Sequence, residues 1–141
     1  MSKDQVSSPA LQNAMRPPRL YAWGWNDDGQ CGLGGYKDCL APTLVSNGEG
    51  ETFVDVACGK LISAAITREG TIYTWGLWGG KPLYLPERLM RWAEDSTLCQ
   101  VSCGIDSVVV LTSTYQLFIR VYDRPLRWFS FPFSADGHIL V

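Results

Sequence analysis

The amino-acid sequence predicts an all-β protein built from repeated antiparallel sheets. Hydrophobic residues make up 46% of the 141 residues and charged residues 18%, and this balance favours a folded core over disorder. Six Trp, six Tyr and five Phe are typical of strands, and 14 Gly and 8 Pro are typical of frequent turns. In addition, two short sequence patterns each occur twice along the chain.

These two patterns define a repeat. Tyr21–Gly24 (YAWG) returns 52 residues later as Tyr73–Gly76 (YTWG), and Val56–Gly59 (VACG) returns 45 residues later as Val101–Gly104 (VSCG). A repeat of this length fits a propeller blade of four short strands. A helical repeat fits badly, because the repeated segments are rich in β-branched residues and are interrupted by Gly. We therefore expect a partial β-propeller of about two four-stranded antiparallel blades.

The elements can be placed in chain order. Residues 1–20 contain Ser7-Ser8-Pro9 and Pro17-Pro18, and we expect them to form a flexible tail. Glycine-rich loops are expected over Asn26–Gly35 and Gly76–Pro82, and a single helical turn over Leu89–Glu94. Strands are expected where β-branched and aromatic residues lie between turn residues: Phe53–Cys58, Ile62–Thr67, Thr71–Trp75, Leu98–Ser102, Val108–Thr112 and Gln116–Val121.

The repeat also suggests how the chain is divided. After the tail, residues 21–72 form a first repeat and residues 73–118 a second one. Beyond Phe118 the Trp-Gly pair is replaced by Ile119-Arg120, and the pattern is lost. We expect residues 119–141 to be an incomplete third blade or an irregular extension.

The segment Tyr21–Gly76 resembles the regulator of chromosome condensation repeat. The resemblance rests on the Trp-Gly pairs, on a Gly-Gln-x-Gly-x-Gly loop that begins at Gly29, and on the Cys-Gly pair that ends at Gly59. A second, degraded copy over about Tyr73–Phe118 keeps a Cys-Gly pair but lacks the glycine-rich loop. The repeat positions that we expect to be structural are Trp23, Gly24, Gly32, Gly34, Gly59, Trp75, Gly76 and Gly104.

The resemblance implies a closed ring of about seven four-stranded blades, whereas this chain has material for about two. Because neighbouring blades bury their faces on one another, two blades alone would expose apolar surface. We therefore expect a fragment, a truncated product or a subunit that is completed by other protein chains or by missing blades. The expected contact edges are Gln116–Val121, as an unpaired strand, and the apolar segment Ile139–Val141.

No catalytic residue and no cofactor are predicted. His138 is the only His, which leaves no credible pairing of a nucleophile with a base. The glycines before Lys81 lack the spacing of a phosphate-binding loop, which also needs Ser or Thr where Pro82 stands. In the family that the repeat resembles, a His commonly follows Cys-Gly by three residues; here Ile62 and Ser107 hold that position.

The five cysteines predict neither a metal site nor a disulfide. No Cys-x-x-Cys pair is present, and no secretory signal precedes the repeats, so reduced, buried thiols are expected. Cys99 and Cys103 lie four residues apart in a predicted strand, which separates their Cα atoms by about 13 Å, too far for a disulfide. Cys58 and Cys103 occupy equivalent repeat positions, which predicts a shared packing role.

Charge and hydropathy limit the classes of partner. The net charge of -2 and the pI of about 5.3 provide no basic patch for direct nucleic-acid contact. No apolar run reaches the roughly 18 residues of a membrane helix. We expect an intracellular protein, cytoplasmic or nuclear, without direct contact to nucleic acid or membrane.

Tryptophans and neighbouring polar residues supply the candidate contact surface. Trp23 and Trp75 recur with the repeat and are expected in the core, whereas Trp25 and Trp78 follow the Trp-Gly pairs in predicted loops and are expected to be exposed. Exposed aromatic side chains are favoured at protein interfaces. The predicted protein-interaction residues are Trp25, Asn26, Asp27, Asp28, Lys60, Trp78 and Lys81.

The predicted function is a non-enzymatic protein-interaction module, a partial propeller that docks onto protein partners or a larger assembly. The alternative, which the resemblance implies, is guanine-nucleotide exchange on a small GTPase, since the founding member of the family acts in this way through loops on the propeller face. That alternative requires a complete ring to hold those loops.

Overall fold

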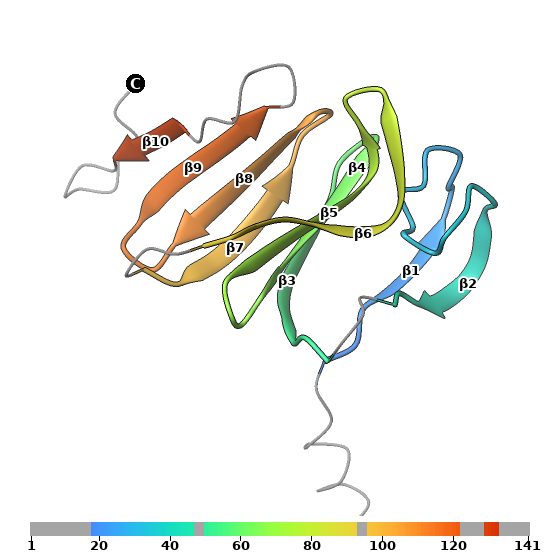
Figure 1. Cartoon of the computed structure of the whole chain (residues 1–141), viewed down its shortest axis with the longest axis horizontal. Coiled ribbons are helices and arrows are strands. Elements are labelled where there is room, and N and C mark those ends of the chain that lie inside the picture. Colours follow the sequence, from blue (N-terminus) through green and yellow to red (C-terminus); the bar gives the residue numbers. More distant parts are fainter. Residues whose placement is uncertain (1–17, 47–49, 93–95, 122–128, 133–141) are drawn as a thin grey trace, which may run out of the picture.

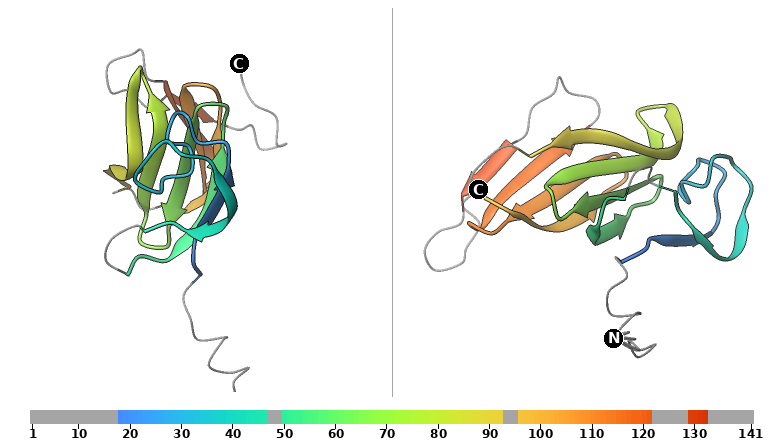
Figure 2. Two further views of the ribbon diagram at one scale, coloured as in Figure 1. Left: turned by 90° about the vertical axis from the view of Figure 1, so that its right-hand side faces the viewer. Right: turned by 60° about the horizontal axis from the view of Figure 1, so that its bottom comes forward.

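All of the regular structure in residues 18–46, 50–92, 96–121 and 129–132, which the computed structural model describes, consists of β-strands (Figure 1). The strands form three antiparallel sheets that lie side by side in chain order (Figure 2). This arrangement confirms the predicted all-β class. The expected flexible tail falls on residues 1–20, of which residues 1–17 lie outside the described part.

Each sheet is built from consecutive strands. The first contains β1 (Tyr21–Gly24) and β2 (Cys39–Leu44), joined by the long segment 25–38. The second runs in the order β3 (Phe53–Cys58), β4 (Ile62–Thr67), β5 (Thr71–Trp78), β6 (Lys81–Arg91). The third runs in the order β7 (Leu98–Cys103), β8 (Ser107–Thr112), β9 (Gln116–Val121), β10 (Phe129–Pro132).

The core is centred on β4 and β5. Every residue of β4 is buried, and so are the first six residues of β5. The sequence of β4, ISAAIT, places Ile-Ala-Ile on one face of the strand and the small residues Ser-Ala-Thr on the other, so both faces can accept close neighbours. Both faces are covered, since the segment 25–38 packs on one side and β7 on the other. Such a strand appears in sequence as a continuous apolar run rather than as an alternating one.

The second and third sheets are joined by specific contacts between β3 and β7. The backbone N–H of Val101 donates a 2.8 Å hydrogen bond to Oδ2 of Asp55. The thiol of Cys103 points to the carbonyl oxygen of Ala57 at 3.5 Å. At the other end of the interface the Trp92 and Phe118 rings meet edge to face, with centroids 4.5 Å apart. The sheets therefore share one hydrophobic cluster.

Two expectations about the region after Trp75 are wrong. Gly76–Pro82 is not a loop, because β5 continues to Trp78 and β6 starts at Lys81. Leu89–Glu94 is not a helical turn in its described part, because Leu89–Arg91 is the end of β6. Pro82 and Pro86 concealed this strand in the sequence. They are tolerated because β6 is the outer strand of its sheet, where one row of backbone N–H groups has no strand partner.

The end of the third sheet also differs from the expectation. We divided the chain after residue 118, but β9 continues to Val121 and pairs with β10. Of the range 119–141, the described residues 119–121 and 129–132 belong to the third sheet, and the domain division itself stays a prediction. Gln116–Val121 is consequently paired on both sides and is not an open edge. The other expected contact segment, Ile139–Val141, lies outside the described residues.

Candidate functional site

The segment between β1 and β2, here called the 25–38 loop, is organised by a buried asparagine. The side chain of Asn26 is 1% exposed. Its amide nitrogen donates to the carbonyl oxygens of Gly35 and Lys37 at 2.9 and 3.0 Å, and its amide oxygen accepts from the backbone N–H of Cys31 at 2.8 Å. A side chain that uses both donors and its acceptor in this way holds the loop in one conformation.

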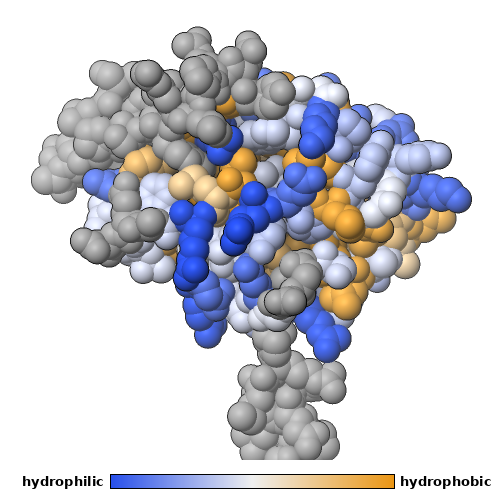
Figure 3. All heavy atoms as spheres, viewed as in Figure 1, coloured by the Kyte–Doolittle hydropathy of each residue, from blue (hydrophilic) through white to orange (hydrophobic). Residues whose placement is uncertain are grey.

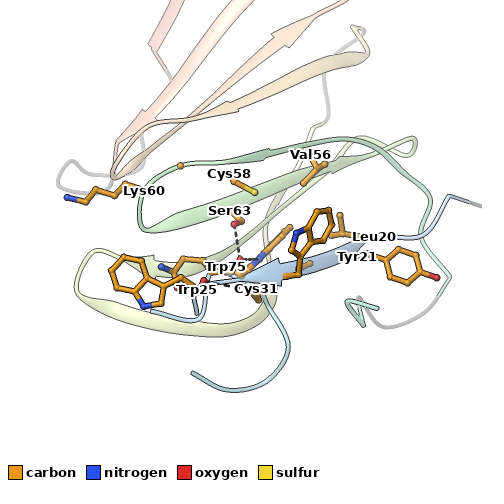
Figure 4. A pocket seen from close by; sticks show the side chains of 13 residues that line it. Leu20, Tyr21, Trp25, Cys31, Val56, Cys58, Lys60, Ser63 and Trp75 are labelled. Carbon is orange, nitrogen blue, oxygen red and sulfur yellow. Dashed lines mark hydrogen bonds between the residues drawn. The ribbon is translucent and has the colours of Figure 1, made fainter. Parts of the chain in front are cut away.

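The 25–38 loop docks on the second sheet through backbone groups. The carbonyl oxygen of Gln30 accepts a 2.7 Å hydrogen bond from Nε1 of Trp75 and a 2.9 Å bond from Oγ of Ser63 (Figure 4). The N–H of Gly34 donates to the carbonyl oxygen of Tyr84 at 2.8 Å. Gly32 has φ +66°, and a Cβ there would lie 2.8 Å from the Trp75 ring. Only glycine allows both this backbone conformation and this close approach.

A cleft of about 400 Å³ lies between β1 and β3, beside the docked loop (Figure 4). We call it the aromatic cleft, because Tyr21, Trp23, Trp25 and Trp75 contribute to its walls. Val56 and Cys58 of β3 face it from the opposite side. Among the thirteen lining residues, Lys60 is the one with a charged side chain. The remaining lining residues are Leu20, Ala22, Gln30, Cys31, Gly59 and Ser63.

Comparison with known proteins identifies the repeat. The family model for the regulator of chromosome condensation (RCC1) repeat matches residues 19–66, which include β1, the 25–38 loop, β2, β3 and most of β4. The chain contains an RCC1 repeat. It is 29% identical over 107 residues to the protein RCC2 homolog of Xenopus laevis, an alignment that covers 71% of this chain and 21% of the relative. The chain thus spans about a fifth of the length of that relative.

Solved structures show the same fold. The crystal structure of human WBSCR16 matches with a TM-score of 0.68 and 21% identity, over 84% of this chain and 36% of that one. Prp20p of Saccharomyces cerevisiae, whose structure was described with its binding properties to Gsp1p and histones, matches with a TM-score of 0.63 and 18% identity, over 89% of this chain and 31% of that one. The chain therefore has the architecture of a partial β-propeller, as the repeat length predicted.

The residues that we expected to contact protein partners lie at different places in the structure. Trp25 is 68% exposed and Lys60 is exposed, and both line the aromatic cleft. Asp27 is exposed and Asp28 is half-buried in the 25–38 loop. Lys81 is exposed at the start of β6, away from the cleft. A contact role for these residues stays a prediction.

Two of the proposed contact residues are buried. Asn26 holds the 25–38 loop, as described above. Trp78 is 9% exposed, because β5 continues through it and its ring packs in the core instead of standing in a loop. Its position after Trp-Gly suggested a loop by analogy with Trp25, but the glycine-rich segment of the first repeat is missing here and the strand continues.

The predicted burial of Trp23 is also wrong, in the opposite direction. We expected it in the core like Trp75, its equivalent one repeat later, yet Trp23 is 62% exposed and Trp75 is 2% exposed. Trp75 lies on a strand with β4 on one side and β6 on the other, whereas within the described residues β1 pairs with β2 only. The exposure of Trp23 follows from this missing neighbour and helps to form the aromatic cleft, which the repeat pattern did not predict.

The cysteines are free within the described part of the chain, and they differ in burial. Cys31, within the 25–38 loop, is buried, and this burial raises its pKa. Burial at the interface of the second and third sheets raises the pKa of Cys103 from 9.0 to about 12. Cys58 is exposed, so the shared packing role expected for it and Cys103 is wrong. The difference arises because β7 packs against β3, while the cleft side of β3 faces open space.

Among the residues that the structure describes, no group of three or more His, Cys, Asp and Glu side chains is arranged to hold a metal ion. The same residues contain no helix long and apolar enough to span a membrane.

Proposed function

We propose that this chain is a non-enzymatic protein-interaction module whose contact surface is the aromatic cleft, and that its partners are intracellular proteins. The observation that carries the proposal is the exposure of Trp23 and Trp25 beside each other on β1 and its loop, at 62% and 68%. Large exposed aromatic side chains around a concave apolar site are typical of the centres of protein interfaces.

The surroundings of the two tryptophans support a protein partner rather than a reaction. Hydrophobic residues are visible where the first and second sheets meet (Figure 3). Val56 and Leu44 add aliphatic area that is 43% and 48% exposed. Apolar patches of this kind on soluble proteins commonly mark contact surfaces. Lys60 lies at the rim, where a charge contributes to partner choice and association rate more than to affinity.

Site-specific photo-crosslinking tests this proposal. A photoreactive phenylalanine derivative placed at Trp25 is expected to form discrete adducts with intracellular proteins, and excess unlabelled chain is expected to compete. The control position is Tyr115, which is 72% exposed at the turn between β8 and β9. Adducts of equal yield at the two positions, or none at position 25, would reject the cleft as a contact surface.

Regulation of a small GTPase is the second candidate, favoured by the likeness to Prp20p, a protein described with its binding to Gsp1p. Guanine-nucleotide exchange would require loops that reach a nucleotide-bound partner, and the 25–38 loop presents the exposed side chain of Asp27 for such a contact. Release of a fluorescent GDP analogue from small GTPases, with and without the chain, tests this candidate. Faster release that Asp27→Ala reduces would support it, and unchanged release would leave the interaction module as the better function.

A further inference from the structure

A second, smaller cavity lies on the other side of the second sheet from the aromatic cleft. Trp75 of β5 lines the aromatic cleft, and because successive residues of a strand point to opposite faces, Thr74 points away from that cleft. This is the side on which β7 packs against β3 and β4, and both sheets concerned have four strands. The cavity has a volume of about 180 Å³. It is lined by residues of β5 and β6, namely Thr74, Trp78, Lys81, Leu83, Glu87, Arg88 and Leu89.

A bulge in β6 adjoins this cavity. Thr74 pairs with Glu87, and Gly76 pairs with Leu83, so β6 advances by four residues where β5 advances by two. The extra residues of β6 bend this strand away from β5 next to Thr74. Pro86 lies within the bulge, where the missing backbone N–H of a proline is tolerated. β-Bulges are frequent beside functional sites, because they redirect side chains and interrupt regular pairing.

Thr74 forms the floor of the cavity and carries a buried hydroxyl group without a partner. Thr74 is 1% exposed, against 9% for Trp78 and 8% for Leu83. Its Oγ1 atom is fully buried and makes no hydrogen bond. The buried Thr67 and Thr112, by contrast, each accept a hydrogen bond from a backbone N–H. Since buried hydroxyl groups are normally hydrogen-bonded, the one of Thr74 marks a position where a ligand atom would supply the missing bond.

The charges around the cavity favour an anion with a single charge. Lys81 and Arg88 are exposed cations among the lining residues, and Glu87 is the exposed carboxylate, so two positive charges stand against one negative charge. A positively charged ligand would meet a net repulsion here. Glu87 would repel a doubly charged phosphate more strongly than a singly charged carboxylate. Trp78 and Leu83 add apolar walls, which suit the methylene groups of an acidic side chain.

We infer that this cavity binds the side chain of a glutamate residue of a protein partner. The carboxylate accepts a hydrogen bond from Oγ1 of Thr74 and is attracted by Lys81, while the methylene groups of the glutamate contact Trp78 and Leu83. A cavity of about 180 Å³ has room for one such side chain. This inference goes beyond the proposed function, because the cavity and the aromatic cleft lie on opposite faces of the second sheet.

Titration of the isotope-labelled full chain, followed by NMR, tests the inference. The probe is a single glutamate residue that is capped at both ends, as its acetyl and methylamide derivative. We expect saturable shifts of the backbone amides of Thr74, Trp78 and Leu83, with a dissociation constant of about 1 mM for a ligand of this size. The matching glutamine and phosphoserine derivatives are expected to bind about tenfold more weakly. Absence of saturable shifts, or equal binding of the glutamine derivative, would overturn the inference.

Two lysine variants locate the binding. Lys81→Met keeps a long apolar stem but removes the charge, and is expected to weaken binding of the capped glutamate about threefold, as for a solvent-exposed ion pair. Lys37→Met makes the same change on the 25–38 loop, which packs on the other face of the second sheet, and is expected to leave binding unchanged. Both lysines are exposed, so both variants are expected to fold. Equal dissociation constants for the two variants would overturn the inference.

Thr74→Val separates a ligand site from a structural hydroxyl group. Val has nearly the same shape, so we expect binding of the capped glutamate to weaken about tenfold while the urea midpoint of the free chain stays equal or rises. A lower midpoint would mean that Oγ1 has a partner within the chain, such as Glu87 opposite it on β6, and would overturn the inference.

Free butyrate serves as a further probe. Tighter binding of butyrate than of the capped glutamate would make a small organic acid the ligand and would also overturn the inference. None of these outcomes bears on the aromatic cleft, because photo-crosslinking at position 25 reports on that surface alone.

Discussion

Nε1 of Trp75 donates a 2.7 Å hydrogen bond to the backbone carbonyl oxygen of Gln30, a residue 45 positions earlier in the chain. The Oγ of Ser63 donates to the same oxygen at 2.9 Å. One carbonyl group of the 25–38 loop thus accepts from two strands of the following sheet. This contact explains why the loop and the tryptophan occur together in the repeat: the loop of one unit covers the tryptophan of the next.

Trp75→Phe tests this hydrogen bond. The variant keeps most of the buried ring area but removes the indole N–H, so we expect the free energy of unfolding in urea to fall by about 1 kcal/mol. Trp23→Phe is the matched control, because Trp23 occupies the equivalent repeat position and is 62% exposed. The free energy of unfolding of this control variant is expected to change by less than about 0.5 kcal/mol. A larger loss of stability for Trp23→Phe than for Trp75→Phe would contradict the assignment of Trp75 as the buried, hydrogen-bonded tryptophan of the two.

Asn26→Ala tests the organisation of the 25–38 loop. The substitution leaves the N–H of Cys31 and the carbonyl oxygens of Gly35 and Lys37 without their partner, and Asn26 itself is buried. We expect a loss of about 1–3 kcal/mol in the free energy of unfolding, measured by urea denaturation. Asp27→Ala, at the exposed neighbouring position, is expected to change it by less than about 0.5 kcal/mol. Comparable values for the two variants would contradict the assignment.

The sequence predicted several strands of the second and third sheets well. Phe53–Cys58, Ile62–Thr67 and Gln116–Val121 have the bounds that the pattern of β-branched residues indicated. These strands pair with chain neighbours through short turns, so local sequence determines them. The sequence did not predict the outer strands β2 and β6. They contain Pro42, Pro82 and Pro86, and Pro is unusual in strands except at a sheet edge.

The candidate site was predicted less completely, for a different physical reason. The exposure of Trp25 follows from its local sequence, which places it in a loop. The exposure of Trp23 depends on whether another strand covers β1, and the burial of Asn26 depends on how a loop folds back over 12 residues to Asp38. Such properties depend on tertiary neighbours, and a repeat pattern indicates equivalence between positions without indicating which neighbours are present.

Thiol reactivity tests the packing of the third sheet against β3. The thiolate is the reactive form, and with a pKa of about 12 the Cys103 thiol is ionised to only about one part in ten thousand at pH 8. Iodoacetamide at pH 8 is therefore expected to modify the exposed Cys58 and Cys99 at least tenfold faster than Cys103, as followed by mass spectrometry of peptides. In urea the difference is expected to disappear. Equal rates in the folded chain would mean that β7 does not pack on β3.

The glycines of the two Cys-Gly pairs lead to the last prediction. A Cβ added at Gly59 would overlap the carbonyl oxygen of Gly104 and lie 3.2 Å from Cβ of Cys103. These atoms belong to the backbone and the root of a side chain, so relief requires the second and third sheets to separate. A Cβ at Gly104 would instead meet the hydroxyl of Ser107, which can rotate to another position.

We therefore expect Gly59→Ala to lower the free energy of unfolding by about 1–3 kcal/mol, the usual effect of overpacking. Gly104→Ala is expected to change it by less than about 1 kcal/mol, because the rotated hydroxyl makes room and the substitution reduces the entropy of the unfolded chain. Urea denaturation of both variants provides the measurement. Larger side chains strengthen the effect, so Gly59→Val is expected to prevent folding, while the double variant Gly104→Ala with Ser107→Ala retains it. An order of stability in which Gly104→Ala is the more damaging variant would show that the two sheets approach each other differently at this point.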